Sequence, residues 1–275
     1  MTILSCKLMG GLGNQLFQIF STISIALSTR KLFLFHHSDF LTTGITRPTY
    51  WNTFLQQINK YTTSDSEVLS LPKMCERCFE YDDLIFVSVN LEKNPICLSG
   101  YFQSYKYFER NYEYIIQLIG LRELQEKIRE KTKINYANSV SLHFRLGDYV
   151  SKQSYHPVMP IKYYMNALSH LSDKVERVIY FGEKEDDATI RISIQVLERK
   201  FPNLEFIRAD LEEDWEQMLL MSVCDHNIIA NSSFSWWGAY FNANPDKIVC
   251  YPATWFGPAL THNTKDLCPT SWHKI

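Results

Sequence analysis

The sequence predicts an α/β protein with doubly wound, mostly parallel sheets. Two observations support this prediction. In the C-terminal half, short apolar runs alternate with longer stretches whose apolar residues recur at helical spacing. The N-terminal half opens with an apolar run, a glycine-rich turn and a helical pattern. Such alternation packs as a parallel sheet between helices, and ligands of these sheets bind beyond the carboxyl ends of the strands. The residues just after each strand are therefore the candidates for chemistry.

The first half begins as strand, turn, helix and strand. The apolar run 3–9 ends at the glycine-rich residues 10–13, and apolar residues then recur at helical spacing over 16–27. Residues 31–35 form a continuous apolar run, which is typical of a parallel strand buried on both faces. Between residues 36 and 94 the pattern is too weak to assign elements.

Regular order returns with a strand at 96–102 and a helix at 108–119. Beyond them, the expected strands are 140–144, 177–181, 204–207, 226–230 and 247–251. The expected helices are 161–171, 186–200, 215–224 and 235–242. The charged segment 123–136 is the expected boundary between an N-terminal domain, 1–135, and a C-terminal domain, 136–275.

The composition excludes several classes of protein. With 28 Lys and Arg against 30 Asp and Glu, the net charge is -2, and no cationic cluster suggests binding to nucleic acid or to an anionic membrane. No run approaches the roughly 20 apolar residues of a membrane span, and no signal peptide is evident. Seven scattered cysteines, an odd number, suit a reducing compartment. We therefore expect a cytoplasmic protein with free thiols and no integral membrane segment, and peripheral membrane association stays open.

The first segment that follows a strand is Gly-Gly-Leu-Gly-Asn-Gln at residues 10–15. It is a poor dinucleotide fingerprint, because a leucine stands where the third glycine would let helix and strand pack closely. Gly11 and Gly13 would let a ligand approach the backbone, and Asn14 and Gln15 supply hydrogen-bonding groups near a helix N-terminus. The alternative is a plain tight turn.

The second segment is His-Phe-Arg-Leu-Gly-Asp-Tyr at residues 143–149. Alternation along the strand points His143 and Arg145 to the same side. Arginine suits a diphosphate, because its planar fork donates two parallel hydrogen bonds and keeps its charge. The alternatives are an Arg145 to Asp148 ion pair that only fixes the turn, and a core histidine.

The third segment is Asn-Ser-Ser-Phe-Ser-Trp-Trp-Gly-Ala at residues 231–239. Ser232, Ser233 and Ser235 place hydroxyls beside the exposed N–H groups of a helix start, which is a favourable anion site. The alternative is that the serines only cap the helix and that the two tryptophans belong to the core.

Metal-binding patterns are weak or missing. The sequence has no Asp-x-Asp, the carboxylate pair that would hold a divalent ion against a diphosphate. The Cys-x-x-Cys at residues 75–78 lacks a second pair or nearby histidines at ligand spacing. We expect no metal and no cofactor.

Taken together, the sequence resembles the inverting α-1,2-fucosyltransferases of glycosyltransferase family 11. The resemblance spans nearly the whole chain and rests on residues 10–15, Gly-Tyr-Phe-Gln-Ser at 100–104, residues 143–149 and the run 226–239. It implies a GT-B fold of two Rossmann-like domains, with an acceptor-side N-terminal domain and a C-terminal domain that binds GDP-fucose. The family usually shows His-x-Arg-Arg-x-Asp, and here Leu146 replaces the second arginine.

The resemblance also implies an activity: metal-independent, inverting transfer of L-fucose from GDP-β-L-fucose to the 2-hydroxyl of a galactose or similar sugar in a glycan. It assigns catalytic roles to Arg145, His143, Asp148 and Asn14. It assigns substrate binding to Gly11, Gly13, Gln15, Asn231, Ser232, Ser233, Phe234 and Ser235. The expected partners are GDP-fucose and a galactose-containing glycan, and no nucleic acid.

Within these assignments, Arg145 would stabilise the charge that grows on the departing GDP. Asn14 would lie near the sugar and the acceptor, and Asp148 or His143 would serve as the base. Two alternatives remain open. One is a fucosyltransferase of another linkage or with a protein acceptor, and the other is a nucleotide-sugar-binding module without turnover.

Overall fold

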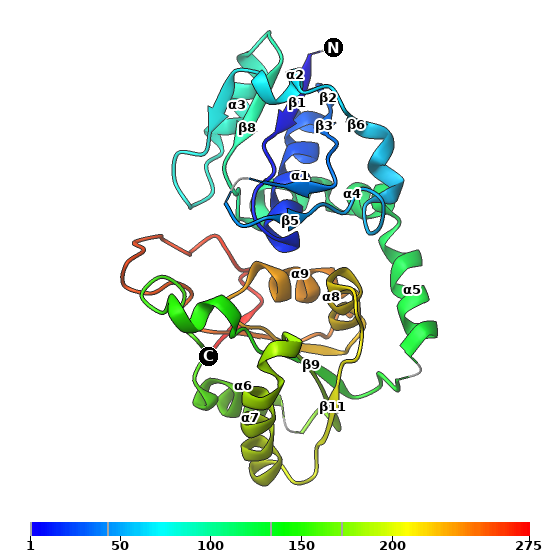
Figure 1. Cartoon of the computed structure of the whole chain (residues 1–275), viewed down its shortest axis with the longest axis vertical. Helices are drawn as coiled ribbons and strands as arrows, with labels where there is room; N and C mark the ends of the chain where they lie inside the picture. The colour runs from blue at the N-terminus through cyan, green and yellow to red at the C-terminus, as the bar shows by residue number, and fades with distance from the viewer. Residues whose placement is uncertain (1, 43, 133, 172) are drawn as a thin grey trace. The chain divides into compact units, whose positions relative to one another are not determined.

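The chain folds into two compact α/β units (Figure 1). The computed structural model describes residues 2–42, 44–132, 134–171 and 173–275. The first unit comprises Met1–Leu124 and His262–Pro269, and the second comprises Gln125–Thr261 and Thr270–Ile275. The chain first passes between the units inside helix α5 (Leu121–Thr132). The domain boundary that we expected after residue 135 lies near this transition. The expectation did not include the return of residues 262–269 to the first unit.

The N-terminal unit is built on a small parallel sheet. Its strands are β1 (Ile3–Cys6), β2 (Leu32–Phe33), β7 (Lys73–Cys75) and β8 (Ile96–Ser99). They pair in the order β2-β1-β8-β7, and every pair is parallel. Helix α1 (Leu12–Ser28) joins β1 to β2 and is buried along most of its length, because it is apolar on most faces. The predicted strand, turn, helix and strand are confirmed.

Short elements fill the stretch where the sequence pattern was weak. They are β3 (Phe35–His36), β4 (Phe40–Leu41), β5 (Arg47–Pro48), η1 (Gln56–Tyr61), β6 (Thr62–Thr63), α2 (Glu67–Ser70) and α3 (Leu84–Leu91). After β8 come η2 (Tyr105–Tyr107), η3 (Glu109–Asn111) and α4 (Tyr112–Ile119). Strands of two residues are too short for periodicity to reveal them, which explains why they were not predicted.

Three expectations for this unit are wrong in detail. The run 31–35 was expected to be buried on both faces, but β2 is a two-residue edge strand and Leu32 is 51% exposed. The strand expected at 96–102 ends at Ser99, because the chain turns at Gly100. The helix expected from residue 108 begins at Tyr112, after the two 3-10 turns.

The C-terminal unit is built on a six-stranded parallel sheet. Its strands are β9 (Ser139–His143), β10 (Arg177–Phe181), β11 (Glu205–Arg208), β12 (His226–Ile228), β13 (Val249–Tyr251) and β14 (His273–Lys274). They pair in the order β11-β10-β9-β12-β13-β14, and every pair is parallel. The first five strands were predicted within a few residues of these bounds. The last, with two exposed residues, was not predicted.

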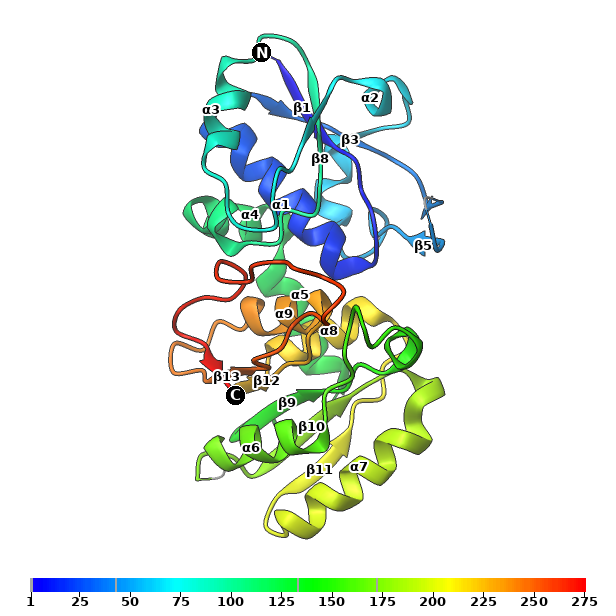
Figure 2. The same cartoon turned by 90° about the vertical axis from the view of Figure 1, so that its left-hand side faces the viewer.

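Helices cover both faces of this sheet. They are α6 (Ile161–Leu171), α7 (Asp187–Lys200), α8 (Asp214–Ser222) and α9 (Ser233–Phe241). Figure 2 shows α6 and α7 on one face and α8 and α9 on the other. Val140, Leu142 and Phe144 pack into the core beneath α6 and α7. Because side chains alternate along a strand, Ser141 and His143 lie on the face of α8 and α9.

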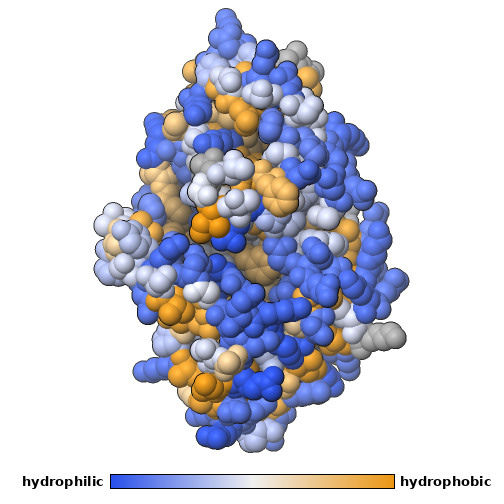
Figure 3. All heavy atoms as spheres, viewed as in Figure 1, coloured by the Kyte–Doolittle hydropathy of each residue, from blue (hydrophilic) through white to orange (hydrophobic). Residues whose placement is uncertain are grey.

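The surface is mostly hydrophilic on the face shown in Figure 3, where hydrophobic residues form small separate groups. All seven cysteines are free, as expected, and only Cys75 and Cys78 are exposed. Within the described parts of the chain, no helix has both the length and the apolar character that a membrane span requires.

Candidate active site

The order of strands in the C-terminal sheet defines where a ligand would bind. Outward from β9 the chain runs through β10 and β11, and outward from β12 it runs the other way through β13 and β14. The direction of winding therefore reverses between β9 and β12, which are neighbours in the sheet. Open parallel sheets bind ligands in the crevice beyond the carboxyl ends of the strands at such a point. The predicted segments 143–149 and 231–239 follow these two strands.

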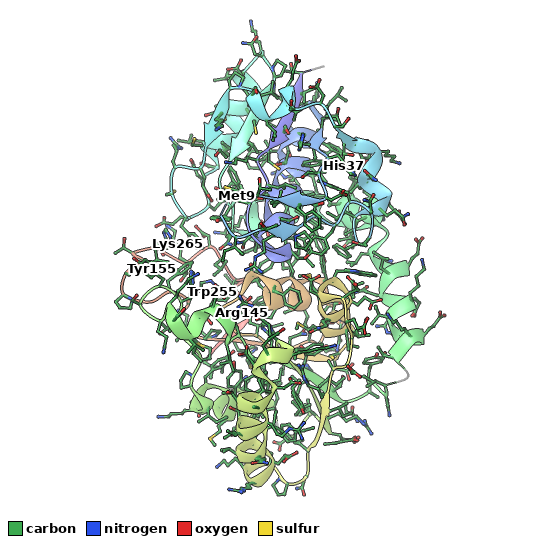
Figure 4. The ribbon with its side chains drawn as sticks, in the orientation of Figure 1. Met9, His37, Arg145, Tyr155, Trp255 and Lys265 are labelled. Carbon is green, nitrogen blue, oxygen red and sulfur yellow. The ribbon has the colours of Figure 1, made fainter. Side chains whose placement is uncertain are left out.

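Arg145 lies just beyond β9 and is held by acidic groups (Figure 4). Its guanidinium donates to Asp148 Oδ1 at 2.6 Å and to the carboxylate of Glu183, and its carbon lies 5.0 Å from the centre of the Tyr149 ring. The side chain is 22% exposed. The ion pair with Asp148 that we considered as an alternative is therefore present, but it leaves part of the guanidinium at the surface.

The side chain of Leu146 points to the opposite side of the chain from that of Arg145. It packs against the core formed with α6 and α7, as alternation from Arg145 suggests. It is thus a packing residue, and the position where this chain departs from the family pattern does not face the edge of the sheet with Arg145.

His143 is buried at the end of β9. Its side chain is 6% exposed, its ring centre lies 5.6 Å from that of Phe234, and its Nδ1 has no hydrogen-bond partner among the described residues. Burial, together with the smaller effect of the nearby cations Arg145 and Arg208, lowers the pKa of His143 to about 3. The imidazole is therefore neutral at physiological pH and a weak base.

Asp148 is an ionised carboxylate at neutral pH. Burial acts to raise its pKa, but Arg145 and Lys152 outweigh that effect and the net pKa is lowered. Its Oδ2 accepts from Lys152 Nζ at 3.3 Å. Both candidate bases are therefore unprotonated at neutral pH, Asp148 as an anion and His143 as a neutral imidazole.

The first residues of α9 include two buried serines that stabilise the helix start and two residues that are partly exposed. Ser232 caps the helix, since its Oγ accepts from the N–H of Phe234 at 3.3 Å, and Ser235 Oγ donates to the carbonyl of Ser232 at 3.4 Å. Both of these serines are buried, whereas Ser233 and Phe234 are partly exposed. The positive end of the helix dipole meets solvent at these two residues, where backbone N–H groups favour an anion. The two tryptophans that follow are fully buried, as the core alternative stated.

Asn231 is a positioning residue between β12 and α9. It is buried, and its Nδ2 donates to the carbonyls of Pro157 and Trp255 at 3.0 Å each. Its own carbonyl accepts from the Tyr149 hydroxyl at 3.2 Å. The loops after β9 and β12 are thereby joined beside Arg145.

The glycine turn of the N-terminal unit presents Asn14. Gly10 has φ 77°, and a Cβ there would lie 2.5 Å from Asn14 Nδ2, so only glycine fits. A Cβ on Gly11 would meet nothing within 4 Å, so neither packing nor backbone conformation requires a glycine there. Asn14 Oδ1 accepts from Gln103 Nε2 at 2.7 Å.

Gln15 and Gly13 are buried within the same turn. Gln15 Nε2 donates to the carbonyls of Gly10 and Pro48 at 3.0 and 2.9 Å, which ties the turn to β5. Three positions on, Gln18 Oε1 accepts from the N–H of Met9, labelled in Figure 4, at 2.9 Å. These amides shape the turn, and both of their side chains are fully buried.

Sequence reasoning missed three residues that contact the candidates. Glu183 pairs with Arg145, Gln103 contacts Asn14, and Glu76 contacts the turn that carries Gln103. Glu183 follows β10 almost directly, so the rule of looking just after each strand would have found it. Glu76 follows β7, whose three residues gave no recognisable pattern.

Possible metal ligands are not clustered in the described part of the chain, since no three His, Cys, Asp or Glu side chains there are arranged to hold an ion. His143, Arg145 and the start of α9 lie at or just beyond the carboxyl ends of β9 and β12.

Comparisons with known proteins agree with the geometry. The family model for glycosyl transferase family 11 matches residues 4–274. An alpha-1,2-colitosyltransferase from Escherichia coli is 27% identical over all of this chain and 99% of its own length. The O-antigen biosynthesis glycosyltransferase WbnK, also from Escherichia coli, is 33% identical over 66% of this chain and 61% of its own. A family 9 glycosyl transferase from Veillonella parvula has a crystal structure with TM-score 0.50 at 12% identity, covering all of this chain and 86% of that one.

Two α/β units on parallel sheets, with the carboxyl edge of one sheet prepared for an anion, define a GT-B glycosyltransferase that uses a nucleotide sugar. The chain belongs to glycosyl transferase family 11.

Proposed function

We propose that this protein transfers L-fucose from GDP-β-L-fucose, with inversion, to the 2-hydroxyl of a galactose or similar sugar in a glycan. The observation that carries the proposal is the meeting of Arg145 and the start of α9 at the reversal point of the C-terminal sheet. Family membership and the similarity to an enzyme named for α-1,2 transfer support it. The C-terminal unit is the proposed donor side, and the N-terminal unit with Asn14 is the proposed acceptor side.

Arg145 can bind a phosphate without leaving its carboxylate partners. A guanidinium has five N–H donors, and the two carboxylates occupy donors on Nη1 and Nη2. The remaining donors would meet the β-phosphate, where negative charge grows as the bond to the sugar breaks. Asp148 and Glu183 would keep the guanidinium oriented, so little reorganisation is needed during the reaction.

His143 and α9 would complete the phosphate site. A neutral imidazole donates one N–H, and the start of α9 adds the positive end of its helix dipole at Ser233. A bound diphosphate would also raise the pKa of His143, because the added negative charge favours the imidazolium. These groups together would neutralise the leaving group, so the proposed reaction needs no metal.

Asp148 is the proposed base for the acceptor hydroxyl. It is ionised and its side chain is 34% exposed, so an acceptor hydroxyl can approach it, whereas His143 is a buried neutral imidazole. A weak base suffices in this reaction, since an oxocarbenium-like transition state makes the acceptor oxygen more acidic as the new bond forms.

The test is transfer with GDP-β-L-fucose and a panel of galactosides. We expect GDP release only when acceptor is present, a mass gain of one fucose, and a product that linkage analysis shows to be α-1,2. Another linkage, or transfer only to protein, would replace the proposed reaction by a related one. GDP-fucose binding without GDP release would identify a binding module.

The similar colitosyltransferase gives a second candidate donor. Colitose is L-fucose without the 3-hydroxyl, so the two donors differ in one polar group. A site with hydrogen bonds to that hydroxyl rejects the deoxy sugar by about 10⁴-fold, whereas a site without them discriminates far less. The ratio of kcat/KM for GDP-fucose and GDP-colitose therefore decides which sugar the enzyme transfers.

A further inference from the structure

A strained turn follows β8 in the N-terminal unit. Phe102 is buried and has φ 53°, in the left-handed region that bulky side chains rarely adopt. Such a conformation is unfavourable for a bulky residue and persists only where the surroundings enforce it. The Phe102 ring packs edge-on against Tyr107, with ring centres 5.4 Å apart. The surrounding packing therefore holds Phe102 in a backbone conformation that is locally unfavourable.

Glu76 is the side chain that enforces the turn. One carboxylate oxygen accepts from the N–H of Tyr101 at 2.8 Å, and the other accepts from the N–H of Phe102 at 2.9 Å. The Glu76 backbone continues the pairing with β8, since its N–H donates to Ser99 at 2.9 Å. Its side chain then crosses Gly100 so closely that a Cβ there would lie 2.3 Å from Glu76 Cβ. Both ends of Glu76 are thus fixed to the end of β8.

The turn delivers Gln103 to the glycine turn at the start of the chain. Gln103 is buried to nine-tenths, and its Nε2 donates to Asn14 Oδ1 at 2.7 Å. Asn14 packs on its other side against Gly10, whose missing Cβ leaves room for the amide. A chain of contacts therefore runs from the Glu76 carboxylate through the backbone at Phe102 to the amide of Asn14.

We propose that Glu76 is a positioning residue for the sugar-transfer site: its carboxylate fixes the strained turn 100–103 and thereby holds the Gln103 amide against Asn14. The proposal rests on the proposed function in one respect, the acceptor-side role proposed for Asn14. It deepens that function by naming a group that acts without touching substrate.

The carboxylate form is the one that completes these contacts. An ionised carboxylate accepts at both oxygens, whereas protonation turns one oxygen into a donor. Burial raises the pKa of Glu76 to about 7, against the two N–H bonds, which lower it. Among nearby ionisable groups, Tyr107 keeps its proton because burial raises its pKa, Arg77 is paired with Asp82, and Cys75 and Cys78 flank the segment. Turnover should therefore rise with pH through about 7 as Glu76 ionises.

The test compares Glu76→Gln with Glu80→Gln. Glu80 lies on the same segment, and its carboxylate binds Lys265 at 2.7 Å and Asn263 instead of the turn 100–103. It is therefore a matched control for Glu76. For Glu76→Gln we expect kcat to fall about ten-fold or more, because small misplacements of reacting groups cost that much. The KM for donor should stay unchanged, and the rise through pH 7 should disappear. Glu80→Gln should keep the wild-type profile.

A double-mutant cycle with Gln103→Ala tests whether Glu76 acts on Asn14 through Gln103. If Glu76 acts through Gln103, the double variant loses no more kcat than Gln103→Ala alone, whereas independent effects multiply. Wild-type kcat and an unaltered pH profile in folded Glu76→Gln overturn the proposal. If Glu76→Gln does not fold, Gln103→Ala provides the test by itself. An unchanged kcat in Gln103→Ala would exclude the positioning of Asn14 through Gln103. If the unmodified protein transfers a sugar other than fucose, the proposed donor is wrong. The Glu76 and Gln103 variants would then be compared with that other sugar.

Discussion

The hydroxyl of Tyr149 donates a hydrogen bond to the backbone carbonyl of Asn231 at 3.2 Å. The same ring lies 5.0 Å beneath the Arg145 guanidinium and stacks on His156, with centres 4.9 Å apart. One side chain therefore joins the loop after β9, the loop after β12 and the proposed phosphate ligand. It fixes Arg145 relative to the start of α9.

Tyr149→Phe should remove this link while keeping the ring under Arg145. We expect a loss of about 1 kcal/mol in the free energy of unfolding, the usual contribution of one hydrogen bond, together with weaker GDP binding. Chemical denaturation and calorimetric titration with GDP measure the two effects. Wild-type GDP affinity in the variant would show that the link stabilises the loops without serving the ligand.

Arg145→Ala should abolish transfer. Removing a fixed cation from a developing phosphate charge costs on the order of 3 kcal/mol, about two decades in rate. Arg145→Lys should also fail largely, because a lysine cannot supply the planar fork. Rates with GDP-fucose and acceptor provide the measurement.

Arg177→Ala is the matched control for Arg145. Both side chains are 22% exposed, and Arg177 pairs with Glu176 and Glu205 at the opposite, amino end of β10. We expect it to lose some stability and to keep turnover. If Arg145→Ala behaves the same way, Arg145 is a structural ion-pair partner and its proposed role is wrong.

His143 should make the protein sensitive to acid. Its pKa is about 3 in the folded chain, against an ordinary value of 6.5, so between these pH values the unfolded chain binds more protons. The free energy of unfolding therefore falls as pH drops through this window, by at most about 1.4 kcal/mol per pH unit for one group. Denaturation of His143→Asn at pH 7, 6, 5 and 4 should show a shallower decline than the wild type. An equal slope in both would mean that His143 is not buried as a neutral group. His226, whose pKa burial also lowers, leaves a residual slope.

Transfer should persist in excess EDTA. Arg145, His143 and the helix start would neutralise the diphosphate, so no divalent ion is required. The measurement is the rate with and without chelator, followed by addition of Mn²⁺ or Mg²⁺. Activity that stops with EDTA and returns only with a metal would contradict this mechanism.

Leu146→Arg should destabilise the protein by about 2 kcal/mol without tightening GDP-fucose binding. Leu146 packs against the core under α6 and α7, so an arginine there loses packing and must bring its charge to solvent. Leu146→Met, which conserves volume, should be nearly neutral. Melting temperature and donor affinity of both variants test this. Tighter, salt-sensitive donor binding in Leu146→Arg would show that the position does face the phosphates.

Much of the C-terminal unit could be predicted from the sequence. The runs at β9, β10 and β12 and the helices α6 to α9 carry strong local periodicity, which reflects burial on both faces of a parallel sheet. Positions 143 to 149 and 231 to 239 were recognised as candidates for the same reason, since each directly follows a strand. In the N-terminal unit, β3 to β6 are two residues long and leave no such pattern.

The sequence by itself determined which segments of the C-terminal unit carry polar groups and, within a few residues, where its main strands end, because these depend on neighbours along the chain. Only the tertiary structure decided that β9 and β12 are adjacent, that Glu183 pairs with Arg145, and that Glu76 reaches the turn before Gln103. These contacts join residues distant in the sequence, and they form because strand order and burial bring them together. Local periodicity carries no information about such pairings, which are set by how the sheets and helices pack.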